Sequence, residues 1–228
     1  MSRASDRSLL VSFGARISIE IHARVRSLLR LLDLSPLPGI VDLIPAYGSI
    51  LIRFDPLRLD HARLEGHVRG LLARREEAAP AEPGIVEIPV CYGGPFGPDL
   101  DEVAQIRGLA PQRVVELHAG SIYHVYFLGF VPGFAYLGDL PEPIVCPRLR
   151  SPRRSVPKGS VGIAGAQTGI YPIDTPGGWR LIGRTPLLMF DPRHDPMSRL
   201  QIGDRVRFAA ITPERFGALE EEWRRSSS

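Results

Sequence analysis

Lysine is almost absent from this chain of 228 residues. Of its 28 basic residues, Lys158 alone is a lysine and all the others are arginines. Chemistry that needs an amine side chain, such as covalent cofactor attachment, therefore has a single candidate. Cysteine is also scarce, because only Cys91 and Cys146 occur, far apart and outside any CxxC pattern. Such a pair predicts reduced, apolar cysteines in a cytoplasmic protein, and neither a disulfide framework nor a zinc site.

Concentrated charge and long apolar segments are missing too. The net charge is +3 and the sequence pI is about 9.1, yet the arginines are interleaved with 25 acidic residues, which does not favour nucleic-acid binding. Residues 117–138 carry no charge, but Pro132 and four glycines there favour a buried strand and loop over a membrane helix. The apolar residues 9–15 are too short a run for a secretory signal. We expect no membrane insertion and no export.

Two amphipathic helices are predicted in the first third of the chain. Ser18 and Asp60 are the expected N-caps, and apolar residues recur at intervals of three and four after each of them. The predicted inner faces comprise Ile21, Val25, Leu28, Leu29 and Leu32 in the first helix, and Leu64, Val68, Leu71 and Leu72 in the second. This spacing places each set on one side of its helix.

Strands alternate with these helices. Residues 9–13 resemble a strand, and the apolar stretches 40–46 and 50–54 flank Tyr47-Gly48-Ser49 in a hairpin pattern. With residues 85–90 as a further strand, the order becomes β-α-β-β-α-β. That order predicts a split βαβ, ferredoxin-like unit.

After a proline-containing linker at residues 78–84, glycine and proline become frequent between short apolar stretches. We therefore expect an N-terminal α/β domain at 1–84 and a second domain at 85–228. Short strands separated by glycine and proline are expected at 122–130, 161–167, 169–173, 179–183 and 205–211. This pattern favours a β-barrel or sandwich.

Helices flank these expected strands. Asp99 and Glu102 form a capping-box pattern for one short helix, and Pro111 opens another. A last helix is expected near residues 213–225, as a surface appendage. The fold class is α+β.

The residues around Lys158 exclude several amine-dependent sites. Ser155-Val156-Pro157-Lys158 matches the SxxK pattern of acyl enzymes, but Pro157 opposes the helical turn that this pattern requires. Lys158-Gly159-Ser160 is not a phosphate-binding loop, because GxxxxGK[ST] places glycine before the lysine. A biotin-carrier lysine lies between methionines, whereas Lys158 lies between Pro157 and Gly159. We expect no biotin on this chain.

No metal-binding pattern is evident. His61 and His67 fall six positions apart on one predicted helix, so they face different sides. The sequence lacks HExxH, and we expect no metal site. His124, on a predicted strand, fits a hydrogen-bonded core residue better than a catalytic base.

Glycine, proline and aromatic residues gather in four segments: GFVPGFAYL (129–137), VPKGSVGIAG (156–165), QTGIYP (167–172) and TPGGWRLIGRTP (175–186). Glycines of this kind indicate tight barrel corners or close approach of the backbone to a ligand. The candidate ligand-binding residues are Pro132, Gly133, Phe134, Lys158, Gln167, Thr168, Tyr171, Thr175, Trp179 and Arg184. Together they would supply hydrogen bonds, a stacking face and anion recognition at an apolar barrel mouth, with Arg184 or Lys158 offsetting ligand charge. No catalytic residue is assigned.

A cluster of basic residues precedes and includes Lys158. It comprises Arg148, Arg150, Arg153, Arg154 and Lys158. These side chains could face phosphates or an acidic partner, or form a solvated basic loop, and the sequence favours neither.

With YGGPFGPDL (92–100), these segments resemble the KipI-like family, which includes allophanate hydrolase subunit 1 and the B subunit of bacterial 5-oxoprolinase. The resemblance runs from about Leu9 to Ile211 and rests on GFxPGFxYL and AGAQTGIYPxxTPGGWxxIGRTP. It implies an N-terminal α/β domain and a C-terminal cyclophilin-like β-barrel, which agrees with the patterns above. A cyclophilin-like fold does not imply prolyl isomerase activity, because function resides in the site.

The resemblance also implies an enzyme subunit that works with partners. These are a second subunit of homologous fold (PxpC-like) and a third that resembles the lactam-utilisation protein LamB. The complex would hydrolyse 5-oxoproline to glutamate with ATP as co-substrate, and the resemblance assigns neither ATP nor catalysis to one subunit. Two alternatives are an inhibitor of a sensor histidine kinase, as KipI is, and a carboxyltransferase-type subunit related to urea carboxylase. The missing carrier lysine weighs against the carboxyltransferase alternative.

Overall fold

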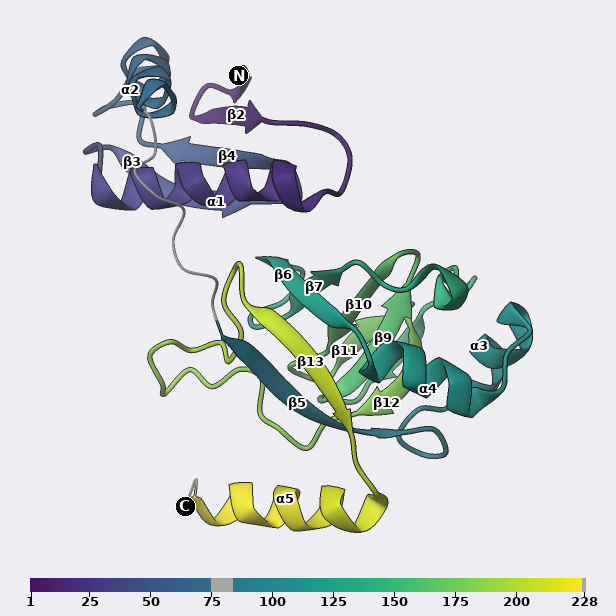
Figure 1. Cartoon of the computed structure of the whole chain (residues 1–228). Helices are drawn as coiled ribbons and strands as arrows, with labels where there is room; N and C mark the ends of the chain where they lie inside the picture. The colour runs from purple at the N-terminus through teal and green to yellow at the C-terminus, as the bar shows by residue number, and fades with distance from the viewer. Residues whose placement is uncertain (75–83, 227–228) are drawn as a thin grey trace. The chain divides into compact units, whose positions relative to one another are not determined.

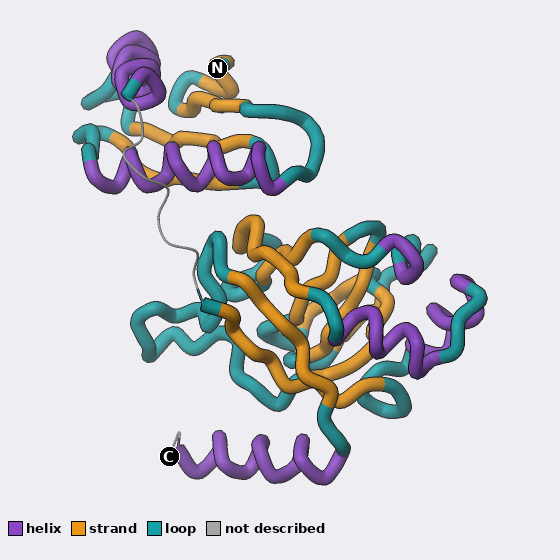
Figure 2. The backbone as a smooth tube through the Cα atoms, viewed as in Figure 1, coloured by secondary structure: helices purple, strands orange, loops and turns teal. Residues whose placement is uncertain are grey.

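The computed structural model describes residues 1–74 and 84–226. The chain divides into two units, Met1–Glu82 and Pro83–Ser228. Their elements are drawn in Figure 1 and traced as helix, strand and loop in Figure 2. The expected linker at 78–84 lies outside the described residues except for Gly84.

An antiparallel sheet and two helices form the N-terminal unit. The strands are β1 (Ser2–Ser5), β2 (Ser8–Ser12), β3 (Ile40–Pro45) and β4 (Ser49–Phe54), in the order β1-β2-β4-β3. The helices are α1 (Ile19–Leu34) and α2 (His61–Ala73). The predicted hairpin is confirmed, since β3 pairs with β4.

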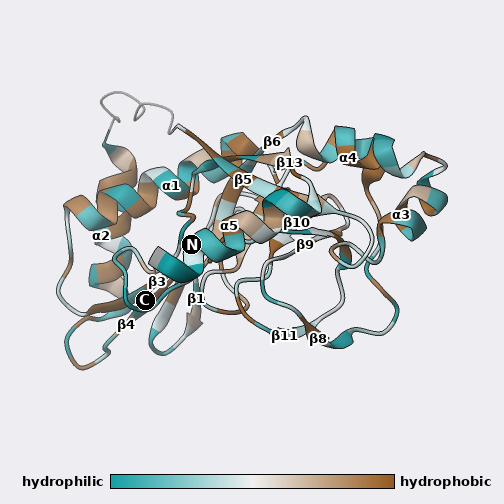
Figure 3. Ribbon diagram, turned by 90° about the horizontal axis from the view of Figure 1, so that it is seen from below, coloured by the Kyte–Doolittle hydropathy of each residue, from teal (hydrophilic) through white to brown (hydrophobic). Residues whose placement is uncertain are grey.

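Both predicted helix caps are confirmed. The Ser18 side chain accepts a hydrogen bond from the Ile21 N–H, and the Asp60 carboxylate accepts one from the Arg63 N–H at 2.8 Å. Figure 3 shows hydrophilic and hydrophobic residues alternating along α1 and α2, as the spacing predicts. Leu72 is 42% exposed, however, because it lies beside the buried stripe and not on it.

The prediction that residues 85–90 add a sixth element to the N-terminal ferredoxin-like unit is wrong. β5 (Ile85–Tyr92) belongs to the second unit, where it pairs in parallel with β13 (Arg205–Ala210). The N-terminal sheet gains its fourth strand from β1, which pairs with β2. The apolar residues of β5, such as Ile88 and Val90, are fully buried in the interior of the second unit, which explains where the strand is placed.

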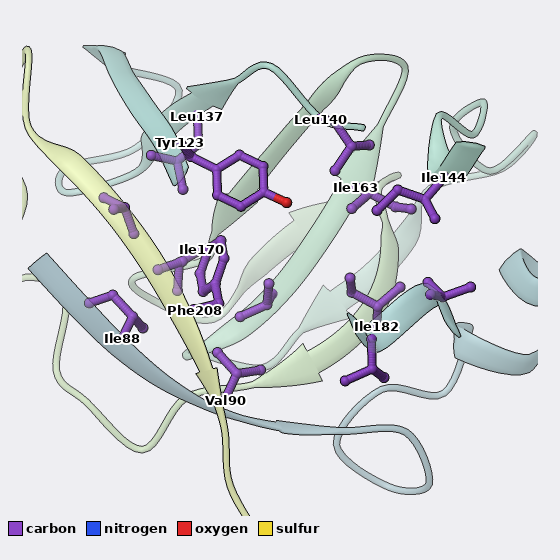
Figure 4. Close-up of a cluster of buried hydrophobic side chains, with 14 of the residues drawn as sticks. Ile88, Val90, Tyr123, Leu137, Leu140, Ile144, Ile163, Ile170, Ile182 and Phe208 are labelled. Atoms are coloured by element: carbon purple, nitrogen blue, oxygen red, sulfur yellow. The ribbon is translucent and has the colours of Figure 1, made fainter. Parts of the chain in front are cut away.

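A closed barrel forms the second unit, so the barrel alternative is correct and the α+β fold class is confirmed. Its strand order is β10-β7-β6-β13-β5-β12-β9. The remaining barrel strands are β6 (Ile122–Leu128), β7 (Ala135–Gly138), β9 (Ser160–Ala164), β10 (Gln167–Ile170) and β12 (Arg180–Arg184). Figure 4 shows the interior filled by residues such as Tyr123, Ile163 and Phe208. The barrel interior is therefore a packed core and not a ligand channel.

Short elements surround the barrel. They are α3 (Leu100–Arg107), α4 (Pro111–Ala119), the 3₁₀ turn η1 (Glu142–Ile144), the two-stranded ribbon β8 (Arg153–Val156) with β11 (Thr175–Gly177), and α5 (Pro213–Ser226). Strands β1, β7, β8 and β11 were not predicted, because they are too short to show a period.

The predicted capping box at Asp99 is wrong. Asp99 precedes α3, but its side chain makes no cap hydrogen bond. Its carboxylate instead accepts hydrogen bonds from Arg153 and from the Leu181 N–H. Glu102 forms an ion pair with Arg180 at 2.7 Å. Partners distant in sequence thus replace the local cap, because the start of α3 packs against β12.

Candidate functional site

A second hydrophobic cluster lies outside the barrel interior. This outer-face cluster comprises the buried residues Phe134, Val156, Ala164, Tyr171, Trp179 and Leu181. Alternation along β10 points Ile170 into the barrel and Gly169 outward. A Cβ on Gly169 would lie 3.0 Å from Phe134 Cζ and 3.1 Å from Trp179 Cζ3. The missing side chain therefore lets two aromatic rings lie directly on the outer face of the sheet.

The rings of this cluster pack edge to face. The Phe134 ring centroid lies 4.9 Å from that of Tyr136, 5.2 Å from that of Tyr171 and 5.4 Å from that of Trp179. Phe134, Tyr171 and Trp179 are buried, so these three predicted ligand-binding residues form a packed layer. Tyr136 is half-buried and brings the layer to the surface.

The ribbon β8–β11 covers part of the layer. Thr175 on β11 pairs with Val156 on β8, whose side chain belongs to the cluster. A Cβ on Gly177 would lie 2.5 Å from the Tyr171 hydroxyl oxygen. Glycine at this position lets the ribbon lie against Tyr171, and Thr175 is half-buried within it.

Positive charge borders the outer-face cluster. The guanidinium carbon of the exposed Arg148 lies 5.9 Å from the Trp179 ring centroid. Burial raises the pKa of Tyr136 and of Tyr171, and the charge of Arg148 opposes that shift. Of the predicted arginine cluster, Arg153 is paired with Asp99, whereas Arg148 remains exposed beside the rings. This edge combines a stacking surface with a cation.

Gln167 and Thr168 point to opposite sides of β10. Thr168 is fully buried, lies 2.9 Å from His118 Nε2 and donates a hydrogen bond to the Gly162 carbonyl. Gln167 is half-buried on the same face as Gly169. Thr168 is thus a core residue, while Gln167 lies on the outer face.

Lys158 and Arg184 line a separate hollow, which we call the α5 pocket. It has a volume of about 300 Å³, and its walls come from residues 158–159, 172, 184–188 and 193 and from α5. α5 packs onto the barrel, since Phe216 is buried and its ring centroid lies 4.7 Å from that of Phe96. Of the described α5 side chains, Phe216 alone is buried, so the helix lies on the surface as expected and is attached there by this residue.

Pro132 and Gly133 line another hollow, of about 610 Å³, together with Phe130. Phe130 is 60% exposed and has a φ of 71°, a left-handed conformation that is rare for large side chains. Its ring packs edge-on against Phe134 at 5.6 Å. No single pocket unites the ten predicted residues, which are divided among the outer-face cluster, the ribbon, the core and two hollows.

Sequence reasoning missed a buried polar network. The Tyr92 hydroxyl lies 2.7 Å from His118 Nδ1, and His118 Nε2 lies 2.9 Å from Thr168 Oγ1. Burial lowers the pKa of His118 to about 3 and raises that of Tyr92. His118 is therefore neutral at neutral pH and joins α4 to the barrel. A single histidine on a helix gives no local signal of this packing.

The remaining candidate residues have ordinary surroundings. Cys91 and Cys146 are free and buried, and burial raises the pKa of both thiols. His124 is half-buried, and its Nδ1 lies 3.5 Å from Asp139 Oδ2 without a hydrogen bond to any described residue, so the expectation of a hydrogen-bonded core residue is wrong. Within residues 1–74 and 84–226, no group of three or more His, Cys, Asp and Glu could hold a metal ion. None of the described helices is long and apolar enough to cross a membrane.

Comparison with known proteins places this geometry in a family. Residues 1–200 match the model of the carboxyltransferase domain, subdomain C and D. The chain is 41% identical to the 5-oxoprolinase B subunit of Bacillus subtilis (strain 168), covering 97% of each protein. It is 49% identical to the 5-oxoprolinase B subunit of Escherichia coli O157:H7, covering 78% of this chain and 80% of that protein.

Solved structures share the fold. TTHA0988 is 40% identical over 90% of this chain with a TM-score of 0.81, and this chain spans 40% of its length. PH0987 from Pyrococcus horikoshii is 48% identical over 94% of this chain and 98% of its own, with a TM-score of 0.57. The urea amidolyase of K. lactis, 22% identical with a TM-score of 0.79, has the same fold over 15% of its length. The chain therefore belongs to the family of carboxyltransferase domains of subdomain C and D type, among the 5-oxoprolinase B subunits.

Proposed function

We propose that this chain is a subunit of an ATP-dependent 5-oxoprolinase that hydrolyses 5-oxoproline to glutamate in the cytoplasm. The observation that carries the proposal is 41% identity to a 5-oxoprolinase B subunit across 97% of both proteins. In the net reaction, one water adds across the lactam C–N bond and a second across the bond to the terminal phosphoryl group of ATP. The products are glutamate, ADP, phosphate and a proton.

The outer-face cluster supplies a surface suited to ATP. The half-buried Tyr136 ring, which stacks on Phe127 with centroids 4.4 Å apart, supplies aromatic surface at the edge of the cluster. The exposed guanidinium of Arg148, over the Trp179 ring, can pair with phosphate oxygens. The exposed Phe130 extends the aromatic edge. We assign ATP to this surface as a co-substrate that partner subunits enclose.

The partners follow from the proposed complex. We propose a second subunit of homologous fold, PxpC-like, and a third that is LamB-like, with catalysis in the assembled complex. TTHA0988 supports a large partner, because this chain corresponds to 40% of that longer protein.

Reconstitution tests this function. The chain is purified with candidate partner subunits, and ATP-dependent release of glutamate from 5-oxoproline is measured. We expect glutamate and ADP to form only when all subunits are present. A complex that assembles without releasing glutamate overturns the proposal, and a fall in histidine-kinase autophosphorylation on adding the chain would then assign it to a KipI-like regulator.

A carboxyltransferase-type function is the second candidate. The family model and the 26% identity to the urea amidolyase of Saccharomyces cerevisiae over 80% of this chain favour a relationship in fold and descent. In the same reconstituted complex, carboxyl transfer from carboxylated free biotin would distinguish this function from lactam hydrolysis.

A further inference from the structure

The α5 pocket has a rigid mouth. The Gly159 N–H donates to the Tyr171 carbonyl at 2.7 Å, and the Thr185 N–H donates to the Gly159 carbonyl at 2.9 Å. Arg184 Nε donates to the Lys158 carbonyl at 3.0 Å. Gly159 has a φ of +81°, and a Cβ there would lie 2.4 Å from the Thr185 carbonyl oxygen. These hydrogen bonds fix the Lys158 backbone and the Arg184 side chain relative to one another.

The pocket carries an excess of positive charge. Four cations line it, but Arg193 is held by Asp191 and Arg224 is paired with Glu220 at 3.1 Å. Neither the Lys158 nor the Arg184 side chain forms an ion pair with any residue of the described ranges, and the nearby Asp174 carboxylate accepts from the Lys158 backbone N–H at 2.7 Å. Two cations beside a partly enclosed hollow are thus left for an anion.

Apolar side chains form part of the remaining walls, beside Thr185 and Glu220. Leu187 and Pro172 lie on the barrel side, and Phe216 and Trp223 come from α5. A pocket of about 300 Å³ is small for a nucleotide and suits a compact ligand that has an apolar body and one acidic group. This lining distinguishes a carboxylic acid from inorganic phosphate, which has no apolar surface to bury.

We propose that the α5 pocket binds a small cyclic monocarboxylate, with its carboxylate at Lys158 and Arg184 and its ring against the apolar wall of Leu187, Phe216 and Trp223, whose indole also packs against Arg199. The identity of this ligand rests on the proposed function: it is the lactam substrate, 5-oxoproline. Lys158 follows Val156 of the outer-face cluster by two residues, and Pro172 follows Tyr171 directly, so the backbone of the pocket wall is continuous with that of the cluster.

The two tryptophans of the chain allow a direct binding test. Trp179 belongs to the outer-face cluster and Trp223 lines the α5 pocket. The full chain with Trp179→Phe reports only on Trp223, and the full chain with Trp223→Phe reports only on Trp179. Titration with 5-oxoproline should change the fluorescence in the first variant, saturably, and leave it unchanged in the second.

Charge-removing variants locate the carboxylate. Lys158→Gln and Arg184→Gln should each weaken 5-oxoproline binding by about tenfold or more, while Lys158→Arg retains it. Because the Lys158 side chain is exposed and makes no described contact, Lys158→Gln should leave the unfolding curve unchanged. Arg16→Gln, an equal charge change at an exposed residue of the N-terminal unit, is the matched control and should bind normally.

Several outcomes overturn the proposal. No response of Trp223, a response of Trp179 alone, or inorganic phosphate binding as tightly as 5-oxoproline would each do so. Because binding is measured on the chain alone, failure here leaves glutamate release by the assembled complex intact, and failure of glutamate release leaves this binding result intact.

Discussion

Asp99 and Arg153, whose side chain is 30% exposed, form an ion pair that fastens the ribbon β8–β11 to the start of α3. Arg153 Nη2 lies 2.6 Å from Asp99 Oδ1, and the Leu181 N–H donates to Asp99 Oδ2 at 2.7 Å. The Asp99 side chain is only 7% exposed. One carboxylate thus holds both the covering ribbon and the strand beneath it.

Asp99→Ala should lower the free energy of unfolding by about 3–5 kcal/mol, because it leaves the Arg153 charge and the Leu181 N–H without their partner. Asp99→Asn should cost less, since its amide oxygen still accepts from Leu181. Urea denaturation of the two variants measures both losses. The control Asp101→Ala, at an exposed position of the same helix, should stay within about 0.5 kcal/mol of the parent. Equal losses for Asp99→Ala and Asp101→Ala would contradict the role of the pair.

His118 should make stability depend on pH. Burial lowers its pKa to about 3 in the folded protein, whereas an unfolded histidine titrates near 6.5. Between these values the unfolded state binds the extra proton, so the stability contribution is complete above pH 6.5 and is lost as the pH falls toward 3. The slope from this group is about 1.4 kcal/mol per pH unit.

Comparison with His118→Gln isolates that slope. Gln can still bond to Tyr92 or Thr168 but does not titrate. Urea midpoints measured from pH 7 to pH 4 should fall more steeply for the parent than for the variant. Parallel pH profiles would show that His118 is not held neutral by the fold.

Two glycine-to-alanine substitutions should have opposite effects. A Cβ on Gly97 would lie 2.0 Å from the Ile182 carbonyl oxygen, so the backbone must shift, and we expect a loss of more than about 1 kcal/mol. Gly217 lies inside α5 with no atom within 4 Å of a Cβ, and alanine there should stabilise the helix by about 0.5–1 kcal/mol. Thermal unfolding of the two variants checks the signs. A stabilised Gly97→Ala protein would refute the close approach.

Arg148→Gln should raise the KM for ATP of the assembled complex about tenfold or more, because a charge-assisted hydrogen bond to phosphate is lost. The KM for 5-oxoproline should stay unchanged, since Arg148 does not line the α5 pocket. Arg148 is exposed, so the unfolding curve should not move. Initial-rate kinetics against each substrate test the claim, with Arg16→Gln as the control. A parallel rise in both KM values would argue against ATP at this surface.

Local patterns predicted much of the N-terminal unit. Ser18 and Asp60 cap the two helices as expected, because a cap involves atoms only a few residues apart. The buried stripe of α2 also follows the spacing of Leu64, Val68 and Leu71. The predictions that Leu72 lies on the buried face and that Asp99 caps its helix were wrong, because each depends on neighbours outside the helix concerned.

The candidate site was predicted in composition but not in arrangement. The sequence identified Phe134, Tyr171 and Trp179, which do pack together. It gave no sign that Thr168 faces His118 inside the barrel, since a one-residue step along a strand reverses the side chain. Arg148 and Trp223 acquired their places only through contacts with residues distant in the chain.

By itself, the sequence determined the helices, the hairpin and the glycine-rich segments that mark the family, because these depend on local periodicity and short motifs. The tertiary structure alone decided that β5 closes the barrel beside β13, where Arg207 and Glu87 pair across 120 positions. It also decided that Lys158 and Arg184 meet under α5 while Trp179 lies elsewhere. Such pairings are set by the burial of whole faces against one another, which no local stretch of sequence encodes.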